Sequence, residues 1–211
     1  TFTCATVVAG LRAVANFARL FNETECGDRY DQAANEIVAA MGEHLYSDEL
    51  GRFLRSLQAN GDELTPDSTV DASLFAVFYF GCFDVNDLMV EGTMIAVEDN
   101  LTNKTNFGGV ARFENDGYMR VSEKVTGNSW FICTLWLAEY YIAKAATKAD
   151  LTRPLEILQW TNDRALPSGV LAEQVNPLTG EELSVSPLTW SHSTFVAAVN
   201  SYLSKLANFR Q

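Results

Sequence analysis

The sequence contains no uninterrupted apolar run of about 18 residues, the length that a membrane-spanning helix requires. Positive charge is also scarce: 15 lysines and arginines stand against 27 aspartates and glutamates, and the formal net charge is −12. No cluster of basic residues offsets this acidic character. Because nucleic acids bind to basic surfaces, we expect neither a nucleic-acid partner nor a membrane partner.

Patterns typical of metal sites and disulfide frameworks are scarce as well. The two histidines, His44 and His192, have no second ligand at metal-site spacing, so we expect no metal ion. The four cysteines form no CxxC pair, and buried thiols are favoured over disulfides. The chain also lacks a nucleophile elbow, a Walker loop, a dinucleotide fingerprint and an HExxH motif. Carboxylate chemistry without a cofactor is the enzymatic option that remains.

The first residues do not resemble a secretion signal. The chain begins with TFTCATVVAGLRAVANFARLF, which has helical periodicity and no basic segment. We interpret this start as the middle of a helix, and we expect a trimmed or partial chain with a cytoplasmic location. Sequons at Asn22, Asn100 and Asn103 are short enough to arise by chance.

Helical periodicity dominates the sequence and predicts an all-α fold in a single domain over residues 1–211. We expect about seven helices, no strand system of any size, a short hairpin or loop over 51–64, and a long functional loop over 102–129. A layered α/α toroid is favoured over a solenoid because no repeat of 33 to 47 residues is found. The last helix is expected to have Ser186 as its N-cap and Pro187 at its first position. The other helices are predicted over 3–22, 28–46, 71–83, 85–102, 130–146 and 150–165.

Several side chains are candidates for a functional site. Glu173, in LAEQV, is either a loop acid bonded to the backbone or a catalytic carboxylate, whereas Glu181 and Glu182 are predicted to be solvated turn residues. Arg112, Asp116 and Tyr118 follow a glycine pair in GGVARFENDGY; the guanidinium suits vicinal hydroxyls, and an internal Arg–Asp pair is the equal alternative.

Two tryptophans lie at junctions between a loop and a helix. Trp130 and Trp190 are placed to face a cleft and contact a sugar ring, with core packing as the alternative. Trp136 and Trp160 are predicted to lie in the core, and His192 is predicted to be a packed, hydrogen-bonded histidine.

Three segments together resemble the glucoamylase and glucodextranase family, glycoside hydrolase family 15: GGVARFENDGY, GNSWFICTLWLAEYY and LAEQVNPLTGEELSVSPLTWSH. The resemblance covers nearly the whole chain and is closer to the bacterial and archaeal branch. It implies the C-terminal part of an (α/α)6 barrel and inverting hydrolysis of terminal α-glucosidic bonds. Trehalose or dextran are the alternative substrates that it implies.

The resemblance also implies a role for individual residues. Glu173 matches the general base, and Arg112 matches an arginine that binds sugar hydroxyls. Trp130 and Trp190 match aromatic positions of the glucose subsites, and we expect Asp116 and Tyr118 to bind substrate with them. The family usually has GNPWF, so Ser129 in place of proline is expected to loosen that junction.

The family's general acid lies in a loop before the helix that opens this chain, and no residue here matches it. We therefore expect an inactive isolated chain with an open barrel edge, completed by an N-terminal part of the same enzyme or by self-association. A catalytically silent saccharide-binding or scaffold module and an all-α interaction protein without a sugar site are the other hypotheses.

Overall fold

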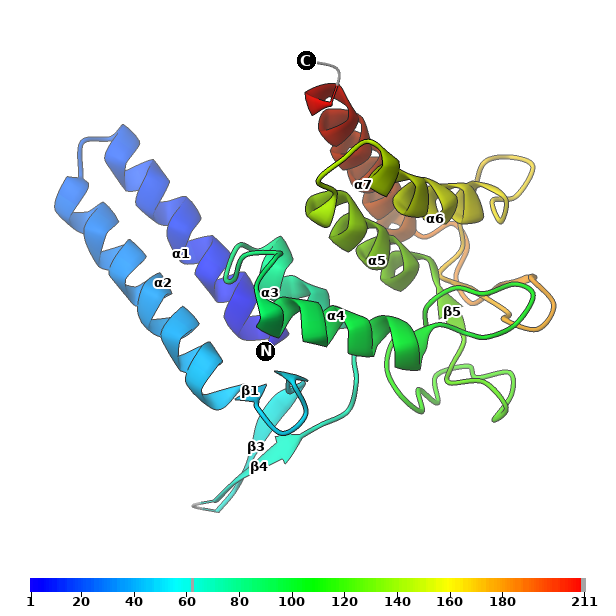
Figure 1. The fold of residues 1–211 in the computed structure, drawn as a ribbon, viewed down its shortest axis with the longest axis horizontal. Helices are drawn as coiled ribbons and strands as arrows, with labels where there is room; N and C mark the ends of the chain where they lie inside the picture. The colour runs from blue at the N-terminus through cyan, green and yellow to red at the C-terminus, as the bar shows by residue number, and fades with distance from the viewer. Residues whose placement is uncertain (62, 210–211) are drawn as a thin grey trace. The chain divides into compact units, whose positions relative to one another are not determined.

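The computed structural model describes residues 1–61 and 63–209 (Figure 1). These residues form two compact units. One unit comprises Thr1–Thr69 and Ala76–Thr93, and the other comprises Val70–Phe75 and the described residues from Met94 onward. The single-domain organisation stays a prediction.

A helical hairpin dominates the first unit. Helices α1 (Phe2–Leu20) and α2 (Thr24–His44) lie side by side in Figure 1 and confirm two predicted helices. Close approach is possible because small residues face the contact. A Cβ atom added to Gly27 would lie 3.1 Å from the carbonyl oxygen of Ala15, so this position has little room for any side chain.

Two short hairpins follow, which confirms the expectation for residues 51–64 except at position 62, which lies outside the described residues. Strand β1 (Tyr46–Ser47) pairs with β2 (Arg52–Phe53), and β3 (Ser56–Asn60) pairs with β4 (Glu63–Asp67), both antiparallel. The continuous helix predicted over 71–83 is wrong: the segment forms a 3₁₀ turn, η1 (Ala72–Phe75), and one turn of α-helix, α3 (Ala76–Tyr79). Gly81, at φ +72°, ends that turn in the left-handed region. Helix α4 (Leu88–Leu101) contributes residues to both units.

The second unit is built around α5 (Phe131–Lys144), which packs against α6 (Thr152–Asn162) and α7 (Thr189–Asn208) (Figure 1). A 3₁₀ turn, η2 (Ala149–Leu151), precedes α6. Nearly every side chain of α5 is buried, as its apolar sequence predicts. Leu135, Leu158 and Ala198 form one core cluster at the meeting of these three helices.

A small antiparallel sheet lies in this unit and was not expected. Its strands, in the order β5 (Ser129–Trp130), β6 (Gln174–Val175) and β7 (Glu182–Leu183), pair Trp130 with Gln174 and Gln174 with Leu183. Glu182 is therefore a half-buried strand residue, which corrects its assignment to a solvated turn, whereas Glu181 is exposed as predicted.

The predicted start of the last helix is wrong. Helix α7 begins at Thr189, and the preceding Leu188 has an extended backbone with φ −112° and ψ 116°. The Leu188 N–H donates to the carbonyl of Leu171 at 3.0 Å, so this residue pairs with another chain segment and does not enter the helix. Ser186 and Pro187 consequently precede the helix without capping it.

All four cysteines are free thiols, and Cys82 and Cys133 are buried. Burial raises the pKa of the Cys133 thiol well above its ordinary value, and the nearby Asp71 carboxylate raises it further. Among the helices of the described residues, none combines the length and the apolarity needed to cross a membrane.

Candidate functional site

The backbone on either side of Glu173 is held by three elements of the second unit. The Glu173 N–H donates to the carbonyl of Val185 at 2.9 Å, and its own carbonyl accepts from the N–H of Phe131 at 3.4 Å. From the first turn of α7, the Ser191 hydroxyl donates to the Ala172 carbonyl at 2.7 Å. His192 Nε2 accepts from the Leu171 N–H at 3.0 Å, which confirms a hydrogen-bonded histidine. The backbone around Glu173 is therefore tied to these elements by hydrogen bonds on both of its sides.

The Glu173 carboxylate is partly buried and has two unequal oxygens. Oε2 accepts hydrogen bonds from the Ser184 hydroxyl at 2.5 Å and from Gln174 Nε2 at 3.1 Å. Within the described residues, Oε1 has no hydrogen-bond partner. A carboxylate held through one oxygen leaves the other to accept a proton from a water molecule.

Ser184 provides its hydroxyl from an unusual backbone position. Its φ is +66°, in the left-handed region that costs a non-glycine residue about 1 kcal/mol or more. Ser184 lies opposite Glu173, in continuation of the pairing between β6 and β7. Backbone strain at this position therefore accompanies a side-chain contact with the candidate base.

Arg112 and Asp116 form a bidentate pair. Arg112 Nε and Nη2 donate to Asp116 Oδ2 and Oδ1, each at 2.9 Å, and Asp116 is only 2% exposed. Burial by itself lowers the pKa of Arg112, but the hydrogen bonds and charge of Asp116 outweigh it, so the pKa is raised and the guanidinium stays charged. The predicted internal pair is thus present. Arg112 Nη1 makes no hydrogen bond to any described residue.

Aromatic rings surround the guanidinium of Arg112. Its central carbon lies 4.6 Å from the ring centroid of Trp130, 4.9 Å from that of Phe113 and 5.5 Å from that of Tyr118. These contacts are within the range of cation–π attraction. Because the Asp116 carboxylate also accepts from the Tyr118 N–H at 3.0 Å, one buried acid orders both Arg112 and the start of the following loop.

The two predicted sugar-facing tryptophans differ in exposure. Trp130 is 3% exposed and lies beneath Arg112 and Tyr118, and its Nε1 is buried without a partner in the described part of the chain. Trp190 is 51% exposed, and its ring lies 5.8 Å from that of buried Trp136. The core prediction for Trp136 is confirmed, and Trp160 is half-buried with its Nε1 bonded to a backbone carbonyl.

Two hydrogen bonds hold the Ser129 side chain at the junction before Trp130. Its hydroxyl donates to the Gly108 carbonyl at 2.6 Å and accepts from Asn103 Nδ2 at 2.9 Å. A Cβ atom on Gly109, whose φ is +86°, would lie 2.6 Å from the Ser129 Cβ, so this junction is tightly packed. The amide of Asn103, which belongs to one of the three sequons, is buried in this contact.

The sheet brings most of the candidate residues together. Trp130 is paired with Gln174, the neighbour of Glu173, and Arg112 stacks on the Trp130 ring. Sequence reasoning missed Ser184 and Gln174 as partners of Glu173. Their only sequence signal is their presence in the same segment as LAEQV.

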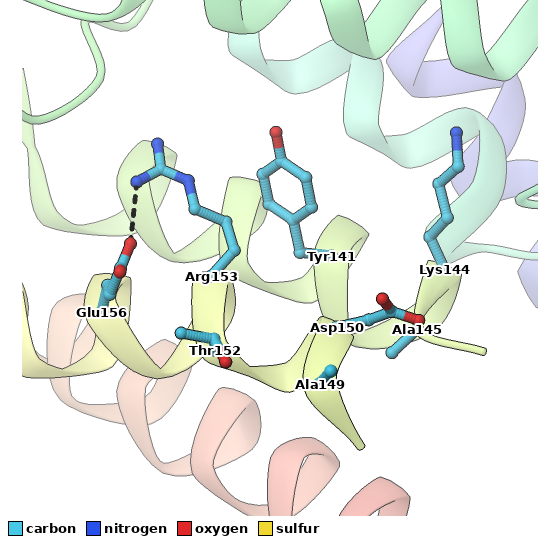
Figure 2. Close-up of a pocket in the computed structure, with 8 residues that line it drawn as sticks. All are labelled: Tyr141, Lys144, Ala145, Ala149, Asp150, Thr152, Arg153 and Glu156. Carbon is cyan, nitrogen blue, oxygen red and sulfur yellow. Dashed lines mark hydrogen bonds and ion pairs between the residues drawn. The ribbon is translucent and has the colours of Figure 1, made fainter. Parts of the chain in front are cut away.

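A separate cavity of about 540 Å³ lies between the end of α5 and the start of α6 (Figure 2). The Tyr141 hydroxyl and Arg153 both donate to Glu98, and Arg153 also pairs with Glu156. Burial and the hydrogen bond to Glu98 raise the pKa of Tyr141, so this hydroxyl stays protonated. None of the predicted site residues lines this cavity.

Comparison with known proteins relates the sequence to one family. The sequence model of Glycosyl hydrolases family 15 matches residues 1–166, a region that includes Arg112 and Trp130 and ends before Glu173. An uncharacterized glycosyl hydrolase of Methanocaldococcus jannaschii is 25% identical over 208 residues, covering 94% of this chain and 31% of that protein.

Solved structures show the same fold. A bacterial glucoamylase complexed with acarbose matches with a TM-score of 0.80 at 23% identity, over 97% of this chain and 33% of that one. A metal-independent α-mannosidase of Streptococcus pneumoniae, complexed with α-1,6-mannobiose, matches with a TM-score of 0.71 at 15% identity, over 97% and 46%. These matches confirm the all-α class and its likeness to part of an (α/α)6 barrel. The chain spans about a third of the length of the Methanocaldococcus jannaschii protein and about a third of the length of the bacterial glucoamylase.

Proposed function

The chain belongs to Glycosyl hydrolases family 15, and on that premise we propose that Glu173 is the general base in the inverting hydrolysis of a terminal α-glucosidic bond. The observation that supports this role most directly is the carboxylate itself, with Oε2 held by two donors and Oε1 without a partner. In an inverting reaction, the base takes a proton from the water that attacks the anomeric carbon opposite the leaving group. An α-glucoside would therefore release β-glucose.

Arg112 and Trp190 are proposed to bind the sugar. Arg112 has one nitrogen, Nη1, available for sugar hydroxyls, while Asp116 and the Trp130 ring fix the orientation of the guanidinium. The exposed ring of Trp190 provides an apolar face for the C–H groups of a pyranose. Tyr118, 46% exposed beside Arg112, is proposed to complete this surface.

The general acid is proposed to come from outside the described residues. No residue here matches the family's acid motif, and two other carboxylates have structural partners. Glu114 Oε2 accepts from the Val70 N–H at 2.7 Å, and buried Glu139 accepts from the Ser201 hydroxyl at 3.2 Å. We therefore expect the isolated chain to release no glucose from maltotriose, trehalose or dextran oligosaccharides. An N-terminal part of the same enzyme would supply the acid.

An activated substrate separates the base from the acid. Fluoride leaves without general-acid assistance, so α-glucosyl fluoride needs only the water-activating half of the site. We expect the chain to release fluoride together with β-glucose, followed by NMR of the anomeric proton, while maltotriose stays intact. α-Glucose as the first product would contradict an inverting base, and glucose release from maltotriose would contradict the need for an external acid.

A catalytically silent saccharide-binding module is the second candidate. The bidentate Arg112–Asp116 pair and its aromatic neighbours lie within one unit and need no catalytic carboxyl group. Quenching of tryptophan fluorescence by maltose, lost in Arg112→Ala, with no release of fluoride from α-glucosyl fluoride, would favour this reading over hydrolysis.

A further inference from the structure

Asn128 is a buried side-chain amide whose orientation is fixed by the backbone. It is 1% exposed; its Oδ1 accepts from the Val121 N–H at 3.1 Å, and its Nδ2 donates to the Met119 carbonyl at 2.8 Å. A backbone N–H only donates and a backbone carbonyl only accepts. The Asn128 amide can therefore satisfy both partners in one orientation alone.

That orientation determines the orientation of Gln174. The second hydrogen of Asn128 Nδ2 is donated to Gln174 Oε1 at 2.7 Å. Gln174 is 0% exposed, and with Oε1 engaged by Asn128, its Nε2 faces Glu173 Oε2 at 3.1 Å. The reverse orientation of this amide would place an acceptor oxygen against the carboxylate and leave a buried donor unpaired, which is unfavourable.

The same amide ties a loop to this pair. Met119 and Val121, the backbone partners of Asn128, lie one and three residues after Tyr118, whose N–H is bonded to Asp116. A continuous series of hydrogen bonds therefore runs from the loop beside Arg112, through Asn128 and Gln174, to the Glu173 carboxylate.

From this series, we infer that Asn128 is a positioning residue that sets which atom of Gln174 faces Glu173 and thereby couples the Tyr118 loop to the carboxylate. Asn128 itself does not contact Glu173 and acts through Gln174. The effect of Asn128 on the rate of hydrolysis rests on the proposed function. Its effect on the orientation of Gln174 beside Glu173 does not.

The side-chain amide signals of Gln174 provide the test. In the ¹⁵N-labelled chain these signals are assigned by their loss in Gln174→Glu. In the wild-type background, we expect Glu173→Gln to shift the Gln174 amide signals. In the Asn128→Asp background, the same substitution should leave these signals in place, because aspartate cannot donate to Gln174 Oε1 and Nε2 then no longer faces residue 173. Asn103→Asp is the matched control: its Nδ2 also donates within the same loop, to Gly127 and Ser129, but does not contact Gln174. In the Asn103→Asp background, Glu173→Gln should still shift the Gln174 amide signals.

A second variant covers the case in which a buried aspartate prevents folding. Asn128→Ala removes the donor without burying a charge. Gln174 Oε1 then loses its partner, so the response of the Gln174 amide to Glu173→Gln should be weaker than in the wild-type background. A response of wild-type size in the folded Asn128 variants would overturn the inference.

Kinetics separate this inference from the proposed function. With α-glucosyl fluoride, kcat of Asn128→Ala should fall about tenfold with KM nearly unchanged, since one misplaced hydrogen bond costs about 1.4 kcal/mol. An altered KM with an unaltered kcat would contradict a positioning role. The expected NMR response in a chain that releases no fluoride would count against the proposed function alone.

Discussion

Arg112 and Asp116 are joined by two parallel hydrogen bonds, from Nε to Oδ2 and from Nη2 to Oδ1, each 2.9 Å long. This planar geometry orients the guanidinium as well as neutralising it. Asp116→Asn retains the shape but removes the charge and one acceptor. We expect a loss of about 2 kcal/mol in the free energy of unfolding, measured in urea, together with weaker quenching by maltose. Asp163→Asn, at an exposed acid on the same unit, is the control and should leave both quantities unchanged.

The role of Ser184 can be separated from its backbone strain. Ser184→Ala and Ser184→Gly both remove the hydroxyl that bonds Glu173, but only glycine adopts φ +66° without cost. We expect both variants to release fluoride from α-glucosyl fluoride more slowly by a similar factor, about tenfold. In thermal unfolding, the glycine variant should be the more stable of the two by roughly 1 kcal/mol. Unimpaired fluoride release by both variants would contradict a role for the hydroxyl.

Ser129 offers a test of the junction before Trp130. Replacing it with the family's usual residue, Ser129→Pro, removes a hydroxyl that bonds both Gly108 and Asn103. We expect a destabilisation of about 1–3 kcal/mol, because the buried Asn103 amide would lose a partner. Ser129→Ala should lose a similar amount if the hydroxyl is responsible. A stabilising proline, seen as a higher Tm, would contradict this account.

Stability should depend on pH through Glu139. Burial in α5 raises the pKa of this carboxyl above its ordinary value of 4.5, and the Ser201 hydrogen bond opposes the shift only in part. The folded state therefore holds a proton that the unfolded state has already released, so Glu139 lowers stability as pH rises above about 4.5. Glu139→Gln should raise Tm at pH 7, and the gain should disappear near pH 4. A difference that is the same at both pH values would contradict this assignment.

The long elements of the fold could be predicted from the sequence. Helices α1, α2 and α5 extend over many turns, and their apolar periodicity or uniform apolarity persists long enough to be recognised. Strands β5, β6 and β7 have two residues each, too few to show any alternation. The start of α7 was missed because the pairing of Leu188 with Leu171 is a tertiary contact that overrides the local signal of Ser186 and Pro187.

For the candidate site, the sequence could predict several of the residues but not the contacts between them. Glu173, Arg112 and Trp190 stand in segments similar to the family's motifs, and Arg112 has the acidic partner expected from its spacing. Asn128 and Gln174 lie 46 residues apart, and their contact exists because β5 and β6 pair. Similarly, the burial of Trp130 follows from Arg112 and Tyr118 lying on its ring, which no local pattern indicates.

The central claim is that Glu173 activates water, and the rate of fluoride release from α-glucosyl fluoride tests it most directly. Glu173→Gln retains the size of the side chain but cannot take a proton, so the initial rate should fall at least 100-fold, within the usual range of about 10²–10⁴ for general-base catalysis. Glu181→Gln, at an exposed acid in the same segment, should retain the wild-type rate. Fluoride release by Glu173→Gln at the rate of the wild-type chain would contradict the account.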